Sequence, residues 1–153
     1  MRVALLLILS LSGGLATAET SDGLFESLAA AKERWEQQRL TDYQFEVFDA
    51  CFCVLLPQMR RVRVVVHHGK TRSLELVGEG WDKSNSAGLV AGLVPMTIPN
   101  WFLFIEWRIR SQPPGNLSIE HDPLDGHPVH FKEDDPAIKY VQMELRIEKF
   151  KRR

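Results

Sequence analysis

Two cysteines and five histidines are the residues of this chain best suited to chemistry. Cys51 and Cys53 are separated by a single residue. Cysteine thiolates bind metals and exchange with disulfides, and in an oxidising compartment neighbouring thiols pair. The compartment in which the chain works therefore decides which chemistry this pair performs.

The first residues of the chain indicate export. Arg2 provides a positive charge, and residues 3–11 are apolar but too few to span a bilayer. Residues 16–18 (Ala-Thr-Ala) have the small side chains that signal peptidase requires. We expect residues 1–18 to be a signal peptide cleaved between Ala18 and Glu19, which makes the mature chain periplasmic or secreted. The alternative is an uncut membrane anchor at residues 1–18.

Export favours a local, structural disulfide between Cys51 and Cys53. Residues i and i+2 of a strand lie about 6.5 Å apart between Cα atoms, at the upper limit of disulfide geometry, so a kink is required. Closing so short a loop stabilises the fold by only about 1.6 kcal/mol. A redox-active pair, buried free thiols and metal ligands are the alternatives. The chain lacks a C-x-x-C motif at a helix start, which argues against thioredoxin-type chemistry.

His121 and His127 flank a turn at residues 122–126 and are expected to face each other across a hairpin. Two imidazoles with Asp122 or Asp125 nearby form a weak candidate site for Zn²⁺ or Cu²⁺. We mainly expect a structural role for both histidines, and metal binding and a pH-dependent response are the two alternatives. The turn itself lacks the alternating oxygen ligands of a calcium loop.

The other three histidines are not expected to join this pair. His130 lies three residues beyond His127 and should point to the other face of the sheet. His67 and His68 are adjacent on a predicted strand and should diverge. The sequence therefore predicts neither a metal site nor a cofactor.

Hydrophobic periodicity predicts the elements that position these residues. A helical stripe, capped by Asp22, is followed by three strands, a second helix capped by Thr97 with Pro99 in its first turn, and three more strands. We expect an α+β fold with an antiparallel sheet of about five or six strands and two helices on one face. The helical stripe is Leu24, Leu28, Ala31 and Trp35; the strands centre on residues 43–47, 62–66, 74–76, 117–119, 129–131 and 141–147.

The second predicted helix is apolar around most of its circumference. Ile98, Trp101, Phe102, Ile105 and Ile109 form the expected core stripe, and further apolar side chains lie outside it. Such a helix needs cover on more than one side. We expect residues 87–96 to fold back over it, and a protein partner or homodimer contact through residues 87–107 is the alternative.

The ordered motifs resemble an uncharacterised family of bacterial exported proteins and lipoproteins, domain of unknown function 6174. The resemblance implies an exported α+β domain and brings no activity. His121 and His127 depart from the aromatic residues that this family tends to have there, and the stretch 78–95 is longer than usual. The matching features are Trp35, Tyr43-x-Phe45, Cys51-x-Cys53, Gly69-Lys70, Thr97-Ile98-x-x-Trp101-Phe102-x-x-Ile105, Asp122-Pro123-x-x-Gly126-x-Pro128, Asp134-Asp135 and Tyr140.

Composition and motifs narrow the function classes. The net charge of −1 offers no basic surface for nucleic acid. The sequence carries no nucleophile-elbow, zinc-protease or phosphate-loop motif, so no catalytic residue is assigned. We expect a signal peptide at 1–18, a linker at 19–22, one globular domain at 23–150 and a basic tail at 151–153, with no membrane-spanning segment in the mature chain. The expected function is non-enzymatic binding in or outside the envelope, and the alternative is thiol-redox or metal handling by Cys51 and Cys53.

Overall fold

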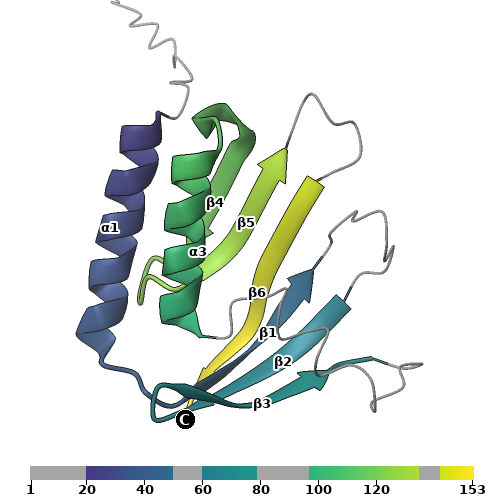
Figure 1. Ribbon diagram of the computed structural model, residues 1–153. Coiled ribbons are helices and arrows are strands. Elements are labelled where there is room, and N and C mark those ends of the chain that lie inside the picture. Colours follow the sequence, from purple (N-terminus) through teal and green to yellow (C-terminus); the bar gives the residue numbers. More distant parts are fainter. Residues whose placement is uncertain (1–19, 50–59, 79–96, 135–141) are drawn as a thin grey trace, which may run out of the picture.

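The computed structural model describes residues 20–49, 60–78, 97–134 and 142–153. Helices and strands follow one another in the order α-βββ-α-βββ, which confirms the predicted α+β class (Figure 1). The elements are α1 (Ser21–Gln38), β1 (Tyr43–Asp49), β2 (Arg60–His67), β3 (Lys70–Leu76), α3 (Ile98–Ser111), a short 3₁₀ turn η1 (Pro114–Asn116), β4 (Leu117–His121), β5 (Pro128–Asp134) and β6 (Gln142–Arg152).

The six strands form one antiparallel sheet in the order β3-β2-β1-β6-β5-β4. Each run of three consecutive strands is a meander, and the pairing of β1 with β6 joins the two meanders in the middle of the sheet. Both helices lie side by side on the same side of the sheet (Figure 1). Neither described helix has the length and hydropathy needed to cross a membrane.

The N-cap of helix α1 lies two residues before the predicted one. The Thr20 hydroxyl accepts a hydrogen bond from the Gly23 N–H at 3.2 Å, so Thr20 is the N-cap. The prediction of Asp22 as the cap was wrong. Asp22 lies instead in the first turn, where its negative charge interacts favourably with the positive end of the helix dipole. The predicted apolar stripe is confirmed as buried: Leu24, Leu28, Ala31 and Trp35.

Helix α3 has the start and the core stripe that the sequence predicts. The Thr97 hydroxyl accepts a hydrogen bond from the Asn100 N–H at 3.3 Å, and Pro99 lies in the first turn. Leu103 and Trp107 remain 62% and 56% exposed on the opposite face. Residues 87–96, the predicted cover, lie outside the described residues. The buried stripe is Ile98, Trp101, Phe102, Ile105 and Ile109.

Tyr43 connects both helices to the centre of the sheet. Its hydroxyl accepts a hydrogen bond from the Ile98 N–H at 3.1 Å, one of the N–H groups that the start of a helix leaves unpaired. Its ring packs edge-on against Trp35 of α1, at 5.3 Å between centroids, and lies tilted against Phe150 of β6 at 5.7 Å. Burial raises the pKa of Tyr43, so the hydroxyl stays protonated. This residue fixes the positions of α1, α3 and β6 relative to β1.

A β-bulge near the end of β6 places Lys149 on the outer face together with Glu148, so that Phe150 points to the inner face. The register with β1 shifts between Gln44 and Glu46, and Lys149 has a positive φ of 50°. Phe150 therefore packs inward against Trp35 at 5.8 Å between centroids. Lys149 points to the outer face, and β6 continues through Arg152 with its basic side chains exposed.

The outer face of the sheet carries charges instead of a second hydrophobic layer. Glu46 is almost fully buried there, with the Arg63 guanidinium and the Lys149 ammonium each 2.9 Å from its carboxylate. Burial alone would raise the pKa of Glu46, but the hydrogen bonds and charges of Lys149 and Arg63 outweigh it and hold the pKa low. These ion pairs close the centre of the outer face.

The turn between β4 and β5 lies directly against α1. Gly126 has a positive φ of 81°, and a Cβ built on it would lie 2.1 Å from the Ala31 carbonyl oxygen. Pro128, two residues later, is fully buried. Only glycine permits this approach of the turn to the helix backbone.

We expect Gly126→Ala to lower the free energy of unfolding by about 3 kcal/mol, because the methyl group meets backbone atoms and the φ is unfavourable for alanine. Urea unfolding followed by circular dichroism measures the change. Gly115→Ala is the matched control, since a Cβ at Gly115 has no heavy atom within 4 Å and should change stability by less than about 0.5 kcal/mol. Equal stabilities for the two variants would contradict the assigned contact.

Candidate functional site

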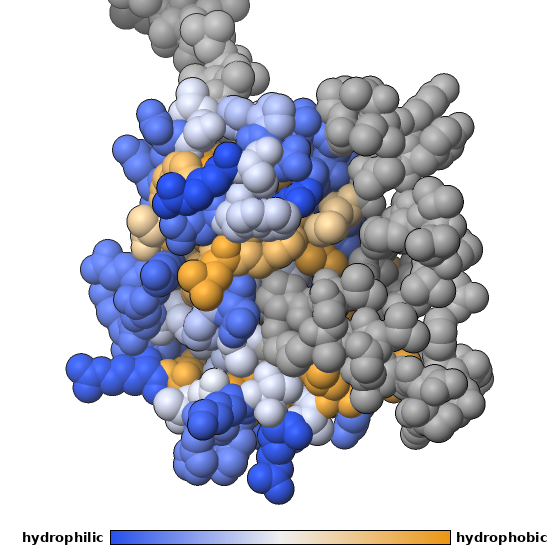
Figure 2. All heavy atoms as spheres, viewed as in Figure 1, coloured by the Kyte–Doolittle hydropathy of each residue, from blue (hydrophilic) through white to orange (hydrophobic). Residues whose placement is uncertain are grey.

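A groove with a largely apolar lining lies between α1 and α3. Its volume is about 490 Å³, within the usual range of small-molecule sites. Figure 2, drawn in the orientation of Figure 1, shows apolar side chains at the surface among the charged side chains of the helical layer. The lining residues are Leu28, Lys32, Trp35, Glu36, Arg39, Leu40, Thr41, Pro99, Phe102, Leu103 and Glu106.

Some charged side chains on the rim of this groove form ion pairs, and one has no partner of opposite charge among the described residues. The Lys32 ammonium lies 4.0 Å from Glu36, and the Arg110 guanidinium lies 2.7 Å from Glu106. The hydrogen bond from Arg110 lowers the pKa of Glu106, which therefore stays ionised. Arg39, at the C-terminal end of α1, has no ion-pair partner for its guanidinium among the described residues. The rim thus presents one cation that an anionic ligand group can reach.

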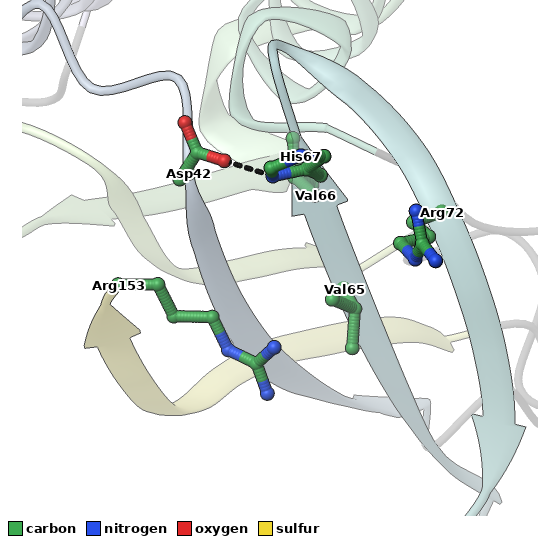
Figure 3. A pocket seen from close by; sticks show the side chains of 6 residues that line it. All are labelled: Asp42, Val65, Val66, His67, Arg72 and Arg153. Carbon is green, nitrogen blue, oxygen red and sulfur yellow. Dashed lines mark hydrogen bonds and ion pairs between the residues drawn. The ribbon is translucent and has the colours of Figure 1, made fainter.

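A second hollow, of about 530 Å³, lies at the end of the sheet where β1 begins and β2 ends. Its walls include Asp42, His67, Arg72 and Arg153 (Figure 3). The Asp42 carboxylate points at the His67 ring and hydrogen-bonds to its Nδ1, whereas the two guanidinium groups lie apart from this pair. A hydrogen bond from the Thr41 hydroxyl, aided by those from His68 and His67, lowers the pKa of Asp42.

His67 and His68 are neighbours in this hollow, so the prediction that they diverge was wrong. His67 ends β2, but His68 lies in the turn with a positive φ of 50°, followed by Gly69 at 72°. Two successive positive φ values are typical of a type I′ hairpin turn. The turn folds the His68 ring back to 3.9 Å from the His67 ring, measured between centroids. Strand alternation did not apply because the strand had already ended.

The structure places His121 and His127 at opposite ends of the β4–β5 turn, each stacked on a phenylalanine. The His121 ring stacks on Phe102 of α3, with 6.2 Å between the ring centroids and 15° between the ring planes. The His127 ring stacks on Phe150 of β6, with 4.3 Å between the ring centroids and 19° between the ring planes. His121 Nε2 is buried and has no hydrogen-bond partner among the residues that the structure describes. Burial, with the nearby charges of Arg34 and His127, lowers the pKa of His121 to about 4.

Asp122, Asp125 and His127 bring ligand atoms within 4.8 Å of one another, but other bonds occupy these atoms. Asp125 binds the His127 ring and its N–H, and the Arg152 guanidinium lies 3.3 Å from its second oxygen. Asp122 accepts hydrogen bonds from two N–H groups within the turn, those of residues 124 and 125. His121 is not a member of this cluster. The bonding of Asp122 and Asp125 is that of a stabilised turn.

His130 lies on the outer face, as predicted, with Nε2 3.0 Å from Glu144. Cys51 and Cys53 lie outside the described residues, so their disulfide stays a prediction. The residues that sequence reasoning missed are Asp42, His67 and His68. The sequence His68-Gly69-Lys70 already predicts a hairpin turn, and a type I′ turn at His68-Gly69 is the signal that His68 turns back.

We expect acid to destabilise the fold through His121. Its pKa is about 4 when folded and near 6.5 when unfolded, so the unfolded chain binds more protons between these values. The contribution of His121 is complete above pH 6.5 and is lost as the pH falls toward 4, about 2 kcal/mol after allowance for solvent at the partly buried ring. Urea unfolding between pH 7 and pH 4.5 measures it.

His121→Phe is the matched variant, because phenylalanine can keep the stack on Phe102 and cannot titrate. The free energy of unfolding of this variant should fall less steeply over the same pH range. Identical slopes for the two proteins would contradict the assignment of the pH dependence to His121.

Comparisons with known proteins give one match. The model of the Family of unknown function (DUF6174) matches residues 27–140, from within α1 to just before β6. No curated protein and no solved structure matches the chain. The matched range covers the larger part of the chain. It includes every residue that lines the two hollows except Arg153. The chain therefore belongs to the Family of unknown function (DUF6174).

Proposed function

We propose that this protein is an exported, non-enzymatic binding module that takes up a small amphipathic anion in the groove between α1 and α3. The observation that carries the proposal is the apolar floor of the groove beside the Arg39 guanidinium, which has no ion-pair partner among the described residues. Export rests on the signal-peptide pattern of residues 1–18, and the absence of a catalytic assignment rests on the sequence motifs.

The shape and chemistry of the groove support a ligand with an apolar body. Leu28, Trp35 and Phe102 form part of its floor, and all three are buried parts of the core. Leu103, by contrast, lines the groove and is 62% exposed. Covering such a side chain stabilises a complex by roughly 25 cal/mol for each Å² of apolar surface removed from water. A rigid, concave and mostly apolar wall is typical of preformed small-molecule sites.

The charges on the rim support an anionic head group. Glu36 and Glu106 already have basic partners, so they do not need a cation from the ligand. Arg39 has none among the described residues, and a guanidinium binds a carboxylate through two parallel hydrogen bonds. A medium-chain carboxylate such as decanoate combines these two features and is the probe we choose.

We expect decanoate to bind the mature chain, which consists of residues 19–153. Binding should shift the backbone amide signals of groove residues in a ¹⁵N–¹H correlation spectrum. Leu103→Glu should weaken binding at least about tenfold, because it places a carboxylate where the apolar chain lies. Arg39→Gln should weaken it by a smaller factor, since it removes the cation for the head group.

Trp107→Glu is the matched control. Trp107 is also an exposed apolar residue of α3, but it does not line the groove, so binding should change less than about twofold. Absence of decanoate binding, or equal weakening by both glutamate variants, would contradict the proposal. Concentration-dependent dimerisation abolished by Leu103→Glu would assign the groove to a homodimer contact instead.

We expect the chain, expressed in a bacterium, to reach the periplasm or medium as a protein beginning at Glu19. Intact-mass spectrometry of each cell fraction checks the cleavage. Ala18→Arg should block processing, because signal peptidase requires a small residue there, whereas Thr17→Gln leaves both small positions intact and should be processed. A wild-type chain that keeps residues 1–18 in the membrane fraction would support the uncut anchor.

A further inference from the structure

The loop before β1 and the hairpin between β2 and β3 bring three metal-binding side chains together. Asp42 immediately precedes β1, His67 ends β2, and His68 opens the turn. The Gly69 N–H donates a hydrogen bond to the Thr41 carbonyl at 2.8 Å. The His68 N–H lies 3.3 Å from the Asp42 carboxylate. These backbone bonds hold the hairpin turn against Asp42.

The three side chains can each offer one ligand atom, and these atoms all lie within 4.8 Å of one another. Two imidazole nitrogens and one carboxylate oxygen form a donor set suited to Zn²⁺ and its neighbours in the first transition series. Ligands of a tetrahedral zinc ion are separated by about 3.4 Å, as follows from metal–ligand distances near 2.1 Å. Small side-chain rotations therefore suffice to enclose an ion.

The donors are accessible from solvent. The His67 side chain is 48% exposed and that of Asp42 is 26% exposed. The ring nitrogens of His68 have no hydrogen-bond partner in the part of the chain that the structure describes. The cluster at Asp122, Asp125 and His127 is less accessible, because the side chains of His127 and Asp125 are only 7% and 6% exposed. An ion from solution can therefore reach the His67–His68 pair without unfolding the turn.

We propose that Asp42, His67 and His68 bind a divalent transition-metal ion, with at least one coordination position open toward the adjoining hollow. On binding, the proton on His67 Nδ1 moves to Nε2 through solvent, and the freed lone pair binds the ion. The hollow also contains the guanidinium groups of Arg72 and Arg153, which lie apart from the Asp42–His67 pair (Figure 3). These positive charges favour an anion at the open position.

Isothermal titration calorimetry with Zn²⁺ tests the proposal on the mature chain without a polyhistidine tag. Cys51→Ser/Cys53→Ser is the background, because it removes the thiols as competing ligands. One zinc ion should bind per chain with a micromolar dissociation constant. Asp42→Asn, His67→Phe and His68→Gly should each weaken binding at least about tenfold. Glycine suits the positive φ of residue 68, and asparagine still accepts a hydrogen bond from the His68 N–H.

His130→Phe is the matched control, since His130 is another histidine of the same sheet but bonds to Glu144. Its zinc affinity should stay within about twofold of the background protein. Thermal melts without metal check that the variants are folded, and only the background and control proteins should gain melting temperature with zinc. No zinc binding, or binding unchanged in all three ligand variants, would overturn the proposal. Phosphate binding without zinc that is lost in Arg72→Ala, with no zinc binding, would overturn it in favour of an anion site.

Discussion

The antiparallel pairing of β1 with β6 is the constraint on which the rest of the structure depends. It joins the first and the last strand of the chain, with Val47 opposite Ile147, and makes one six-stranded sheet from two three-stranded meanders. Without it, each meander would expose a row of unpaired backbone groups. Because the two strands are almost a hundred residues apart in sequence, closing this contact carries a loop-entropy cost that the buried aromatic cluster around Tyr43 must offset.

The same pairing determines where charged side chains lie. The bulge at Lys149 brings an ammonium group to buried Glu46 on the outer face and turns Phe150 toward the core. Beyond the bulge, Arg152 reaches the carboxylate of Asp125 in the β4–β5 turn. The Arg153 N–H donates to the Asp42 carbonyl at 3.1 Å, beside the hollow with the two adjacent histidines. One irregularity in one strand thus links the core, the turn and this hollow.

The motif residues on which the sequence resemblance rests have structural roles in this fold. Gly126 allows the β4–β5 turn to contact α1, and the Thr97 hydroxyl caps α3. Trp35 and Tyr43 pack together in the aromatic cluster. His121 and His127 stack as flat rings on Phe102 and Phe150. These residues therefore form a core and its turns, and the two hollows must be assigned from their own geometry.

The sequence by itself determined the order of elements and the faces that they bury. Periodicity of 3.6 in α1 and α3 and of 2 in the strands follows from local backbone geometry, so residues such as Leu28 and Val64 were correctly placed in the core. Fold class followed, because amphipathic strands and helices have few ways to cover each other. The start of α3 at Thr97 and Pro99 was equally local.

Only the tertiary structure decided which distant residues meet. The α1–α3 groove joins Trp35 to Leu103, and no spacing rule relates residues on separate helices. Asp42 meets His67 because β1 pairs with β2 in one particular register, with Tyr43 opposite Val66. His68 joins them because a turn reverses the alternation that a strand would impose. Register and turn conformation depend on contacts across the whole sheet, so the sequence pattern determined the elements and the tertiary structure determined the sites.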